Sequence, residues 1–268
     1  MMKIGFIGLG NMGGSLARLV AKDERFRSEL LLANRSCDKA EKIAAEVGGQ
    51  PVSNKEVFAQ AEVIFLGIKP AQFADLLADY REILEKRESL LLVSMAAGLP
   101  LMLLEKLTPS HHRWIRIMPN TPVAVGEGVI SYALSQQANQ ADEDLLRELL
   151  SSAGLLVKLE EKQLDAATAL AGCGPAFVYL FIEALADAGV RAGLSRDISL
   201  ELANQTLLGT AKLSQVSGQH PAELKDQVCS PAGSTIAGVA SLEENAFRGT
   251  VMDAVQAAYK RTQELGKK

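Results

Sequence analysis

Residues 3–13 decide the fold, and they read Lys3-Ile4-Gly5-Phe6-Ile7-Gly8-Leu9-Gly10-Asn11-Met12-Gly13. The first five residues form an apolar run that predicts a buried strand, and the periodic residues 15–20 predict a helix. Glycines between a strand and a helix are typical of the turn that holds a dinucleotide pyrophosphate. Gly8 allows the tight turn, Gly10 lets the main chain approach the phosphates, and Gly13 lets helix and strand pack together. The start of the chain therefore predicts a dinucleotide-binding site.

Further apolar runs predict a Rossmann-type, doubly wound α/β sheet. The next strands are expected at residues 30–33, 63–67, 90–94 and 114–117, and helical stretches such as 38–47 separate most of them. Alternating strands and helices favour a parallel sheet with helices on both faces. Residues 128–132 and 155–158 are candidates for additional edge strands.

From about Glu160 the pattern changes to helices alone. Alanine, leucine and polar residues at helical spacing predict helices over 176–192, 199–216 and 247–265. We therefore predict two domains, residues 1–159 for the dinucleotide and residues 160–268 for substrate binding and dimerisation. Residues 90–104 and 166–182 are long and uncharged, but they are short for a membrane span and contain glycine and proline, so we expect both to be core. The second segment is too apolar for a solvated helix, and a second copy of the chain would cover it.

The composition limits the kinds of binding partner and the cellular compartment that we expect for this chain. The 268 residues carry a formal net charge of −4, which gives no general attraction to nucleic acid or to anionic membranes. Cys37, Cys173 and Cys229 have no spacing typical of a disulfide framework or a metal site. His111 and His112 lack an evident third ligand, so we expect no metal. The first residues do not resemble a signal peptide, and we expect a cytoplasmic enzyme.

The second predicted strand ends at Asn34-Arg35-Ser36, with no acidic residue. An acid there would bind the ribose hydroxyls of NAD, whereas a guanidinium can pair with the 2′-phosphate of NADP. We therefore predict NADP(H), with NAD(H) as a second cofactor; alternatively, Arg35 is a solvated surface residue. Lys69-Pro70 and Ala97 follow the third and fourth strands, where ligands bind in such sheets, although Lys69 could also be an ordinary surface lysine.

Residues 230–236 predict a second anion site. Proline and small residues precede an apolar periodic run, as in a loop that enters a helix. Free N–H groups at Gly233, Ser234 and Thr235 would bind a carboxylate. Thr235 is our candidate catalytic hydroxyl, which would help to deliver a proton. Alternatively, Thr235 caps the helix.

Five motifs in this order resemble the pyrroline-5-carboxylate reductases over nearly the whole chain. They are Gly8 to Gly13, Lys69-Pro70, Pro119-Asn120-Thr121-Pro122, Gly172-Cys173-Gly174-Pro175-Ala176 and Ser230-Pro231-Ala232-Gly233-Ser234-Thr235. The last motif is the most specific, although Ala232 and Ser234 depart from the glycine and the threonine or alanine of many members.

The resemblance implies NADPH-dependent reduction of 1-pyrroline-5-carboxylate to L-proline by hydride transfer to the imine carbon. It also implies a homodimer or a higher ring, such as a pentamer of dimers. The residues it places near the cofactor are Asn11, Met12, Asn34, Asn54, Gly67, Lys69 and Ala97, and those near the substrate are Glu161, Gln227, Ser234 and Thr235. Asn120 either lines the crevice near the nicotinamide or belongs to a plain turn.

Two other functions compete with this interpretation. A β-hydroxyacid dehydrogenase joins the same sheet to a helical domain, but its catalytic lysine is absent from residues 172–191. A non-enzymatic NADP-binding sensor would need the glycine turn but not residues 230–235.

Overall fold

The structure is a computed structural model, and it describes residues 2–266. These residues divide into two compact units, which are described separately below. The first unit is discontinuous: it contains the residues up to Cys173 and those from Ala258 onwards. The second unit is Gly174–Ala257. The division at residue 159, which the composition predicts, stays a prediction.

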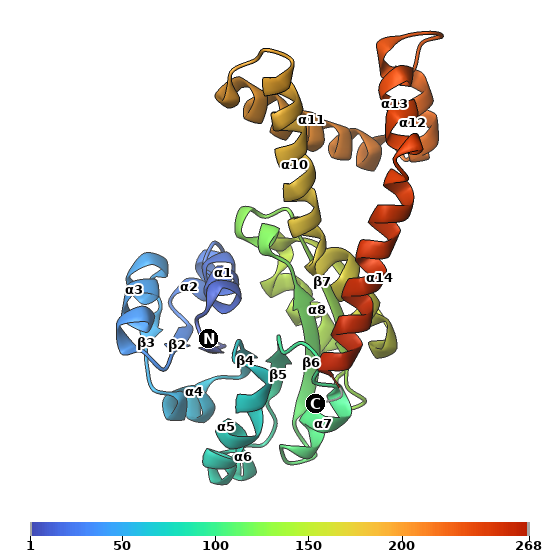
Figure 1. Cartoon of the computed structure of the whole chain (residues 1–268). Coiled ribbons are helices and arrows are strands. Elements are labelled where there is room, and N and C mark those ends of the chain that lie inside the picture. The colour runs from blue at the N-terminus through green and yellow to red at the C-terminus, as the bar shows by residue number, and fades with distance from the viewer. Residues whose placement is uncertain (1, 267–268) are drawn as a thin grey trace. The chain divides into compact units, whose positions relative to one another are not determined.

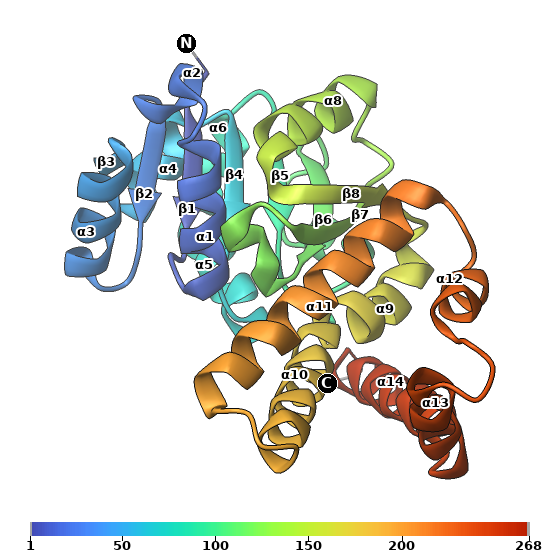
Figure 2. The same cartoon turned by 90° about the horizontal axis from the view of Figure 1, so that it is seen from above.

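The first unit contains one eight-stranded sheet in the order β3-β2-β1-β4-β5-β6-β7-β8. Figure 2 shows the strands from β3 to β6 side by side in this order. The strands are β1 (Ile4–Ile7), β2 (Leu30–Ala33), β3 (Gln50–Pro51), β4 (Val63–Leu66), β5 (Leu91–Ser94), β6 (Arg113–Pro119), β7 (Gly128–Leu134) and β8 (Gly154–Lys158). The first six in spatial order are parallel, which confirms the predicted Rossmann-type sheet.

Two strands differ from the sequence prediction. β7 is not at an edge: it lies between β6 and β8, antiparallel to β6. Only residues 120–127 connect β6 to β7, which is too short for a crossover, so the chain must turn back. β3 was not predicted, because two residues that include a proline carry no strand periodicity.

Helices cover both faces of the sheet (Figure 1). One apolar cluster joins one face to α1 (Asn11–Val20), α2 (Glu24–Arg27), α3 (Cys37–Val47) and α8 (Gln140–Leu149). The other joins the opposite face to α4 (Asn54–Gln60), α5 (Phe73–Asp79), α6 (Arg81–Lys86), α7 (Leu101–Lys106) and α9 (Leu164–Ala167). Residues 90–104 supply much of the second cluster, which confirms them as core except for the exposed Ala97, Met102 and Leu103. Because both faces are covered, β1, β2, β4 and β5 are wholly buried, whereas the edge strands β3 and β8 are largely exposed.

Short helical turns complete this unit. They are η1 (Pro70–Gln72), η2 (Thr121–Val125), η3 (Ser151–Ala153), η4 (Glu161–Gln163) and the π-helical turn η5 (Thr168–Gly172). The predicted stop after α3 is confirmed, because Gly48 ends that helix in the left-handed region, at φ 82°.

The second unit is all helical, as predicted. Its helices are α10 (Gly174–Arg191), α11 (Arg196–Ser217), α12 (Pro221–Val228), α13 (Ser234–Glu244) and the first part of α14 (Phe247–Leu265). α10 and α11 pack closely, since a Cβ added at Gly189 would lie 2.6 Å from Ser199 Oγ. Ser195 caps α11 by accepting the N–H of Ile198.

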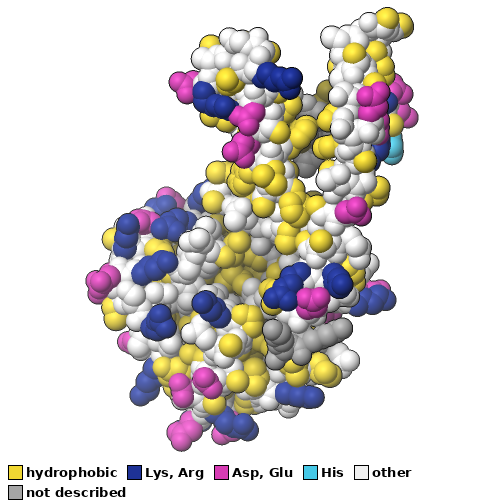
Figure 3. Space-filling model, in the orientation of Figure 1, with side chains coloured by type: hydrophobic (Ala, Val, Ile, Leu, Met, Phe, Trp, Pro, Cys, Tyr) yellow, Lys and Arg dark blue, Asp and Glu magenta, His cyan; other side chains and the backbone are white. Residues whose placement is uncertain are grey.

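Most apolar side chains of the second unit are not covered by the chain itself. Leu180 is 66% exposed, and Leu208 and Met252 are 61% and 66% exposed. Figure 3 shows hydrophobic side chains on the surface of these helices. The single chain does not bury most of residues 166–182, so the predicted core is wrong for one chain, whereas burial against a second copy stays a prediction. By length and composition alone, the helical segment Glu161–Arg191 could also cross a membrane.

Candidate active site

Three glycines close the turn between β1 and α1. Gly8 has φ +91°, which favours glycine, and a Cβ there would lie 2.6 Å from the carbonyl oxygen of Gly67. Cβ atoms at Gly13 and Gly67 would lie 2.1 and 2.5 Å from the carbonyl oxygen of Gly8. These three positions therefore need glycine in order to bring β1, α1 and β4 together, whether or not a ligand binds.

No close contact within the protein requires glycine at position 10. Apart from its neighbours in the chain, no described residue comes within 4 Å of a Cβ added at Gly10, so the space beside it is open. Gly10 is the N-cap of α1, where no described side chain caps the helix and the first turn has no acidic residue. Asn11 and Met12 begin that helix, and its N–H groups and positive dipole end suit an anion. The turn fits a dinucleotide pyrophosphate that approaches Gly10 closely.

Asn34 connects the end of β2 to the glycine turn. Its Oδ1 accepts the N–H of Leu9 at 3.0 Å, and its Nδ2 donates to the carbonyl oxygen of Ser36 at 3.2 Å. These bonds fix the main chain on both sides of the predicted ribose position. Ser36 itself is the N-cap of α3, without a side-chain capping bond to any described residue.

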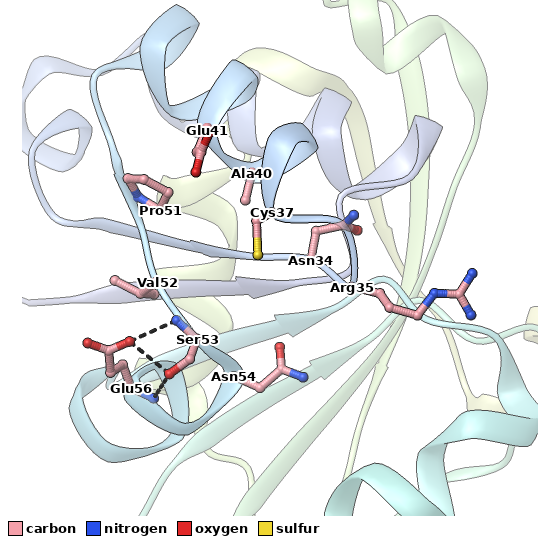
Figure 4. Close-up of a pocket in the computed structure, with 10 residues that line it drawn as sticks. All are labelled: Asn34, Arg35, Cys37, Ala40, Glu41, Pro51, Val52, Ser53, Asn54 and Glu56. Carbon is pink, nitrogen blue, oxygen red and sulfur yellow. Dashed lines mark hydrogen bonds between the residues drawn. The ribbon is translucent and has the colours of Figure 1, made fainter.

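A cleft of about 480 Å³ lies beyond Asn34. Its lining residues are Asn34, Arg35, Cys37, Ala40, Glu41, Pro51, Val52, Ser53, Asn54 and Glu56. Arg35 forms no salt bridge with a described residue, and in Figure 4 its side chain extends away from Glu41 and Glu56. The structure thus brings together three of the predicted cofactor residues, Asn34, Arg35 and Asn54. Cys37, which the sequence analysis assigned to no site, also lines the cleft.

Glu56 is held at the far side of the cleft by the capping box of α4. Its Oε2 accepts the N–H and the hydroxyl of Ser53, at 2.8 and 2.7 Å. These hydrogen bonds lower the pKa of Glu56, so its negative charge persists at neutral pH. A 2′-phosphate would therefore have to be bound on the Arg35 side of the cleft.

The turns after β4 and β5 lie at the same sheet edge as the glycine turn, because β1, β4 and β5 are parallel neighbours. Lys69 and Pro70 are exposed there, and the N–H of Lys69 donates to Gln72 Oε1 at 3.2 Å. Ala96 is buried, whereas Ala97 is exposed. Small residues in this turn leave space for a flat ring near the main chain.

Asn120 uses both ends of its carboxamide within the protein. Its Oδ1 accepts the N–H of Val129 at 2.8 Å, and its Nδ2 donates to the carbonyl oxygen of Ala171 at 3.0 Å. In a regular helix that carbonyl would bond the N–H of Pro175, which proline lacks. Asn120 therefore stabilises the π-helical turn, and its contact with a cofactor stays a prediction.

The proposed substrate residue Glu161 begins η4 in the first unit. Its Oε1 accepts the N–H of Leu101 at 2.6 Å and lies 3.3 Å from Nη1 of Arg116. Asp165 Oδ1 lies 3.3 Å from Nη2 of the same guanidinium. Arg116 and Asp165 were not predicted as site residues, because only the fold brings residues so far apart in sequence together.

In the second unit, residues 230–235 form a turn that enters α13, as predicted. The N–H of Gly233 is not free, contrary to our expectation: it donates to the carbonyl oxygen of Ser230 at 3.1 Å and closes the turn. Gly233 is the N-cap of α13 and no described side chain caps it, so the N–H groups of Ser234 and Thr235 begin the helix. Thr235 is therefore not the helix cap, and that alternative is wrong.

Gln227 lies in the last turn of α12 and is exposed. Its Nε2 donates to Gln219 Oε1 at 3.3 Å. Cys229 follows α12 as a free thiol, like Cys37 and Cys173. The substrate contacts of Glu161, Gln227, Gly233, Ser234 and Thr235 stay predictions.

His112 belongs to the core of the first unit. Its Nδ1 accepts the N–H of Leu90 at 3.2 Å, so its Nε2 carries the proton and donates to the carbonyl oxygen of Leu84 at 3.0 Å. Burial, reinforced by the neighbouring His111, lowers the pKa of His112 to about 4. Within residues 2–266, no three His, Cys, Asp or Glu side chains are grouped to hold a metal ion.

Comparisons with known protein families match both parts of the chain. Residues 3–98 match the family described as NADP oxidoreductase, coenzyme F420-dependent. Residues 161–265 match the family described as pyrroline-5-carboxylate reductase dimerisation.

Individual relatives match over nearly the full length. A pyrroline-5-carboxylate reductase of Pisum sativum is 44% identical over 98% of this chain and 95% of the relative. One from Synechocystis is 40% identical over 100% of this chain and 99% of the relative. The chain is also similar to the crystal structure of a Plasmodium falciparum pyrroline carboxylate reductase with NADP bound. The match has a TM-score of 0.87 and 37% sequence identity, and it covers 99% of this chain and 98% of the other chain. By its motifs, its fold and these full-length matches, the chain belongs to the pyrroline-5-carboxylate reductase family.

Proposed function

We propose that this chain reduces 1-pyrroline-5-carboxylate to L-proline with NADPH, in the last step of proline biosynthesis. The observation that carries this proposal is the full-length match to curated reductases, 44% identical over 98% of the chain, which includes both anion-binding turns. NADH is the second cofactor, and the cytoplasm is the proposed compartment.

The first unit supplies the groups that bind the dinucleotide. The N–H groups at the start of α1 bind the pyrophosphate beside Gly10, and Arg35 binds the 2′-phosphate. Ala97 allows the nicotinamide to lie close to the main chain after β5. The bound cofactor supplies the hydride, and the protein supplies its orientation.

The substrate has a carboxylate and a ring imine. The N–H groups of Ser234 and Thr235 bind the carboxylate at the N-terminus of α13, where no described side chain competes for them. The Thr235 hydroxyl hydrogen-bonds the ring nitrogen and passes a proton to it while it takes up a proton from water. Protonation makes the imine carbon electrophilic, so little further acid catalysis is required.

The second unit functions as a homodimer, and the dimers assemble into a larger ring. The exposed apolar side chains of α10, α11 and α14 support this proposal, because a second copy would remove them from water. Covering by a second copy also accounts for the apolar segment Glu161–Arg191 without a membrane. We propose no nucleic-acid, membrane or metal partner. Light scattering behind gel filtration, with activity measured across the peak, tests the dimer, and a fully active monomer would refute it.

The decisive experiment follows NADPH oxidation by absorbance when pyrroline-5-carboxylate is added. We expect turnover that Thr235→Ala abolishes and that Thr235→Ser, which keeps the hydroxyl, largely retains. Tight NADPH binding without oxidation would favour the sensor function and overturn the proposal. Equal turnover by wild type and Thr235→Ala would remove Thr235 from its catalytic role.

A further inference from the structure

Arg116 places a charged guanidinium inside the first unit. Its side chain is 4% exposed, although it projects from the middle of β6, between Ser94 of β5 and Ala133 of β7. Its Nε has no hydrogen-bond partner among the described residues. Removing a guanidinium from water is costly, and an apolar side chain of similar size is often more stable at such a position. Stability alone therefore gives no reason for an arginine here.

Two carboxylates share this guanidinium. Nη1 lies 3.3 Å from Glu161 and Nη2 lies 3.3 Å from Asp165. The side chains of Glu161 and Asp165 are 31% and 30% exposed, so the buried cation joins two acids that reach the surface. One positive and two negative charges leave a net charge of −1 at this cluster.

Glu161 is also attached to the turn after β5. Its Oε1 accepts the N–H of Leu101, the first residue of α7, where the N-cap is Pro100 and provides no side-chain cap. α7 follows the turn at Ala97 and Gly98, which is the proposed nicotinamide position. Both bonds of Glu161 go to Oε1, and Oε2 accepts no hydrogen bond from the residues that the structure describes. One carboxylate oxygen is thus anchored and the other is available.

We propose that Arg116 is a positioning residue, which holds the carboxylate of Glu161 so that the negative charge on Oε2 lies beside the protonated substrate ring. Asp165 binds the other end of the guanidinium and fixes its orientation. The inference rests on the proposed function, because it assigns a role to residues that support Glu161 in that reaction.

A double-mutant cycle of Arg116→Met and Glu161→Gln tests the proposal. We expect each single variant to raise KM for pyrroline-5-carboxylate about tenfold or more, the size of one lost hydrogen bond to a charged group, with KM for NADPH little changed. KM of the double variant for pyrroline-5-carboxylate should be little higher than that of the more impaired single variant, because both changes remove the same interaction. Additive effects, or equal increases of both KM values, would overturn the role of Arg116.

Arg113→Met provides a matched control on the same strand. Arg113 is paired with the buried Asp142 and has its own unpartnered Nε among the described atoms, but it lies three residues away and on the opposite face of β6. We expect this variant to lower thermal stability without changing KM for pyrroline-5-carboxylate. A similar KM increase in Arg113→Met would show that Arg116 acts only through folding.

Asp165→Asn keeps the test decisive if Arg116→Met does not fold. It removes one of the two charged partners of Arg116 and leaves Glu161 unchanged, so KM for pyrroline-5-carboxylate should rise while KM for NADPH stays constant. An unchanged KM would overturn the proposed cluster. A wild-type chain without reductase activity would overturn the proposed function together with this inference, whereas an active wild type with additive variants would overturn the inference alone.

Discussion

Gly98 lies directly against Gly266, although 168 residues separate them in the sequence. A Cβ added at Gly98 would lie 2.9 Å from the Cα of Gly266 and 3.2 Å from the carbonyl carbon of Leu265. Both contacts belong to the first unit, so the end of α14 packs main chain against the turn after β5. That turn is the proposed nicotinamide position, and the end of the chain therefore supports it.

Replacing Gly98 with alanine should disturb this turn in two ways. The residue has φ +73°, where a side chain costs about 1 kcal/mol, and the new methyl group would clash with Gly266. We expect a lower free energy of unfolding in urea and a higher KM for NADPH. In a chain that ends at Leu265, Gly98→Ala should cost less, because the two closest contacts of the new methyl group, both with Gly266, are removed and only the contact with Leu265 and the conformational cost remain. Equal costs in both chains would contradict the supporting contact.

Ala232 occupies a position that favours glycine. It has φ +57°, in the left-handed region, immediately before the N-cap of α13. Ala232→Gly should raise the free energy of unfolding by roughly 0.5–1 kcal/mol, because it relieves the left-handed strain but frees the unfolded chain. Thermal unfolding measures the gain in stability. KM for pyrroline-5-carboxylate shows whether the turn still binds the substrate.

Ala246 offers the matched control, since it has φ +54° between α13 and α14. Ala246→Gly should give a similar gain in stability without any effect on KM for pyrroline-5-carboxylate. A loss of stability in Ala232→Gly alone would mean that the turn at residue 232 is held by more than its backbone conformation.

Stability should depend on pH through His112. Burial lowers the pKa of this imidazole from its ordinary value of 6.5 to about 4, so the folded chain binds the proton less readily than the unfolded chain. The full contribution is therefore present above about pH 6.5 and is lost as the pH falls towards 4. The loss amounts to roughly 3 kcal/mol for a shift of this size.

Urea unfolding between pH 7 and pH 4.5 measures this effect in wild type and His112→Gln. The glutamine can accept the N–H of Leu90 and donate to the Leu84 carbonyl oxygen, but it does not titrate, so the pH dependence should be smaller. His111→Gln, at the exposed neighbour, should keep most of the wild-type dependence, because burial, the main cause of the lowered pKa, is unchanged. The same slope in wild type and His112→Gln would refute the assignment.

Local patterns were sufficient for the sheet and for the glycine turn. The runs at residues 30–33 and 63–66 are so apolar, and Gly8 to Gly13 so characteristic, that each element could be predicted from its own residues. The direction of β7 depends instead on the short connection to β6. Exposure of Leu180 depends on what the other helices can cover, and a single segment does not contain that information.

The residues of the candidate site likewise include some that sequence patterns predict and some that only the fold brings together. Arg35 and Asn54 could be proposed because the carboxyl ends of strands and the start of a helix are recognisable in sequence. Arg116 could not, since a lone arginine inside an apolar strand gives no sign that Glu161 and Asp165, 45 and 49 residues later, are its partners. The occupied N–H of Gly233 likewise follows from the turn geometry and not from the composition of the loop.

Arg35 should discriminate between the two cofactors. It lines the cleft beside Asn34 without a salt bridge to any described acid, so its charge is available to a 2′-phosphate. Arg35→Ala should raise KM for NADPH about tenfold or more, the value of a charge-assisted hydrogen bond, and leave KM for NADH nearly unchanged because NADH has no 2′-phosphate. Lys42→Ala removes the same charge from the exposed surface of α3, outside the cleft lining, and should affect neither cofactor. If Arg35→Ala weakened both cofactors equally, its guanidinium would act on a group that they share, and the preference for NADPH would have to come from Asn34, Ser36 or Asn54.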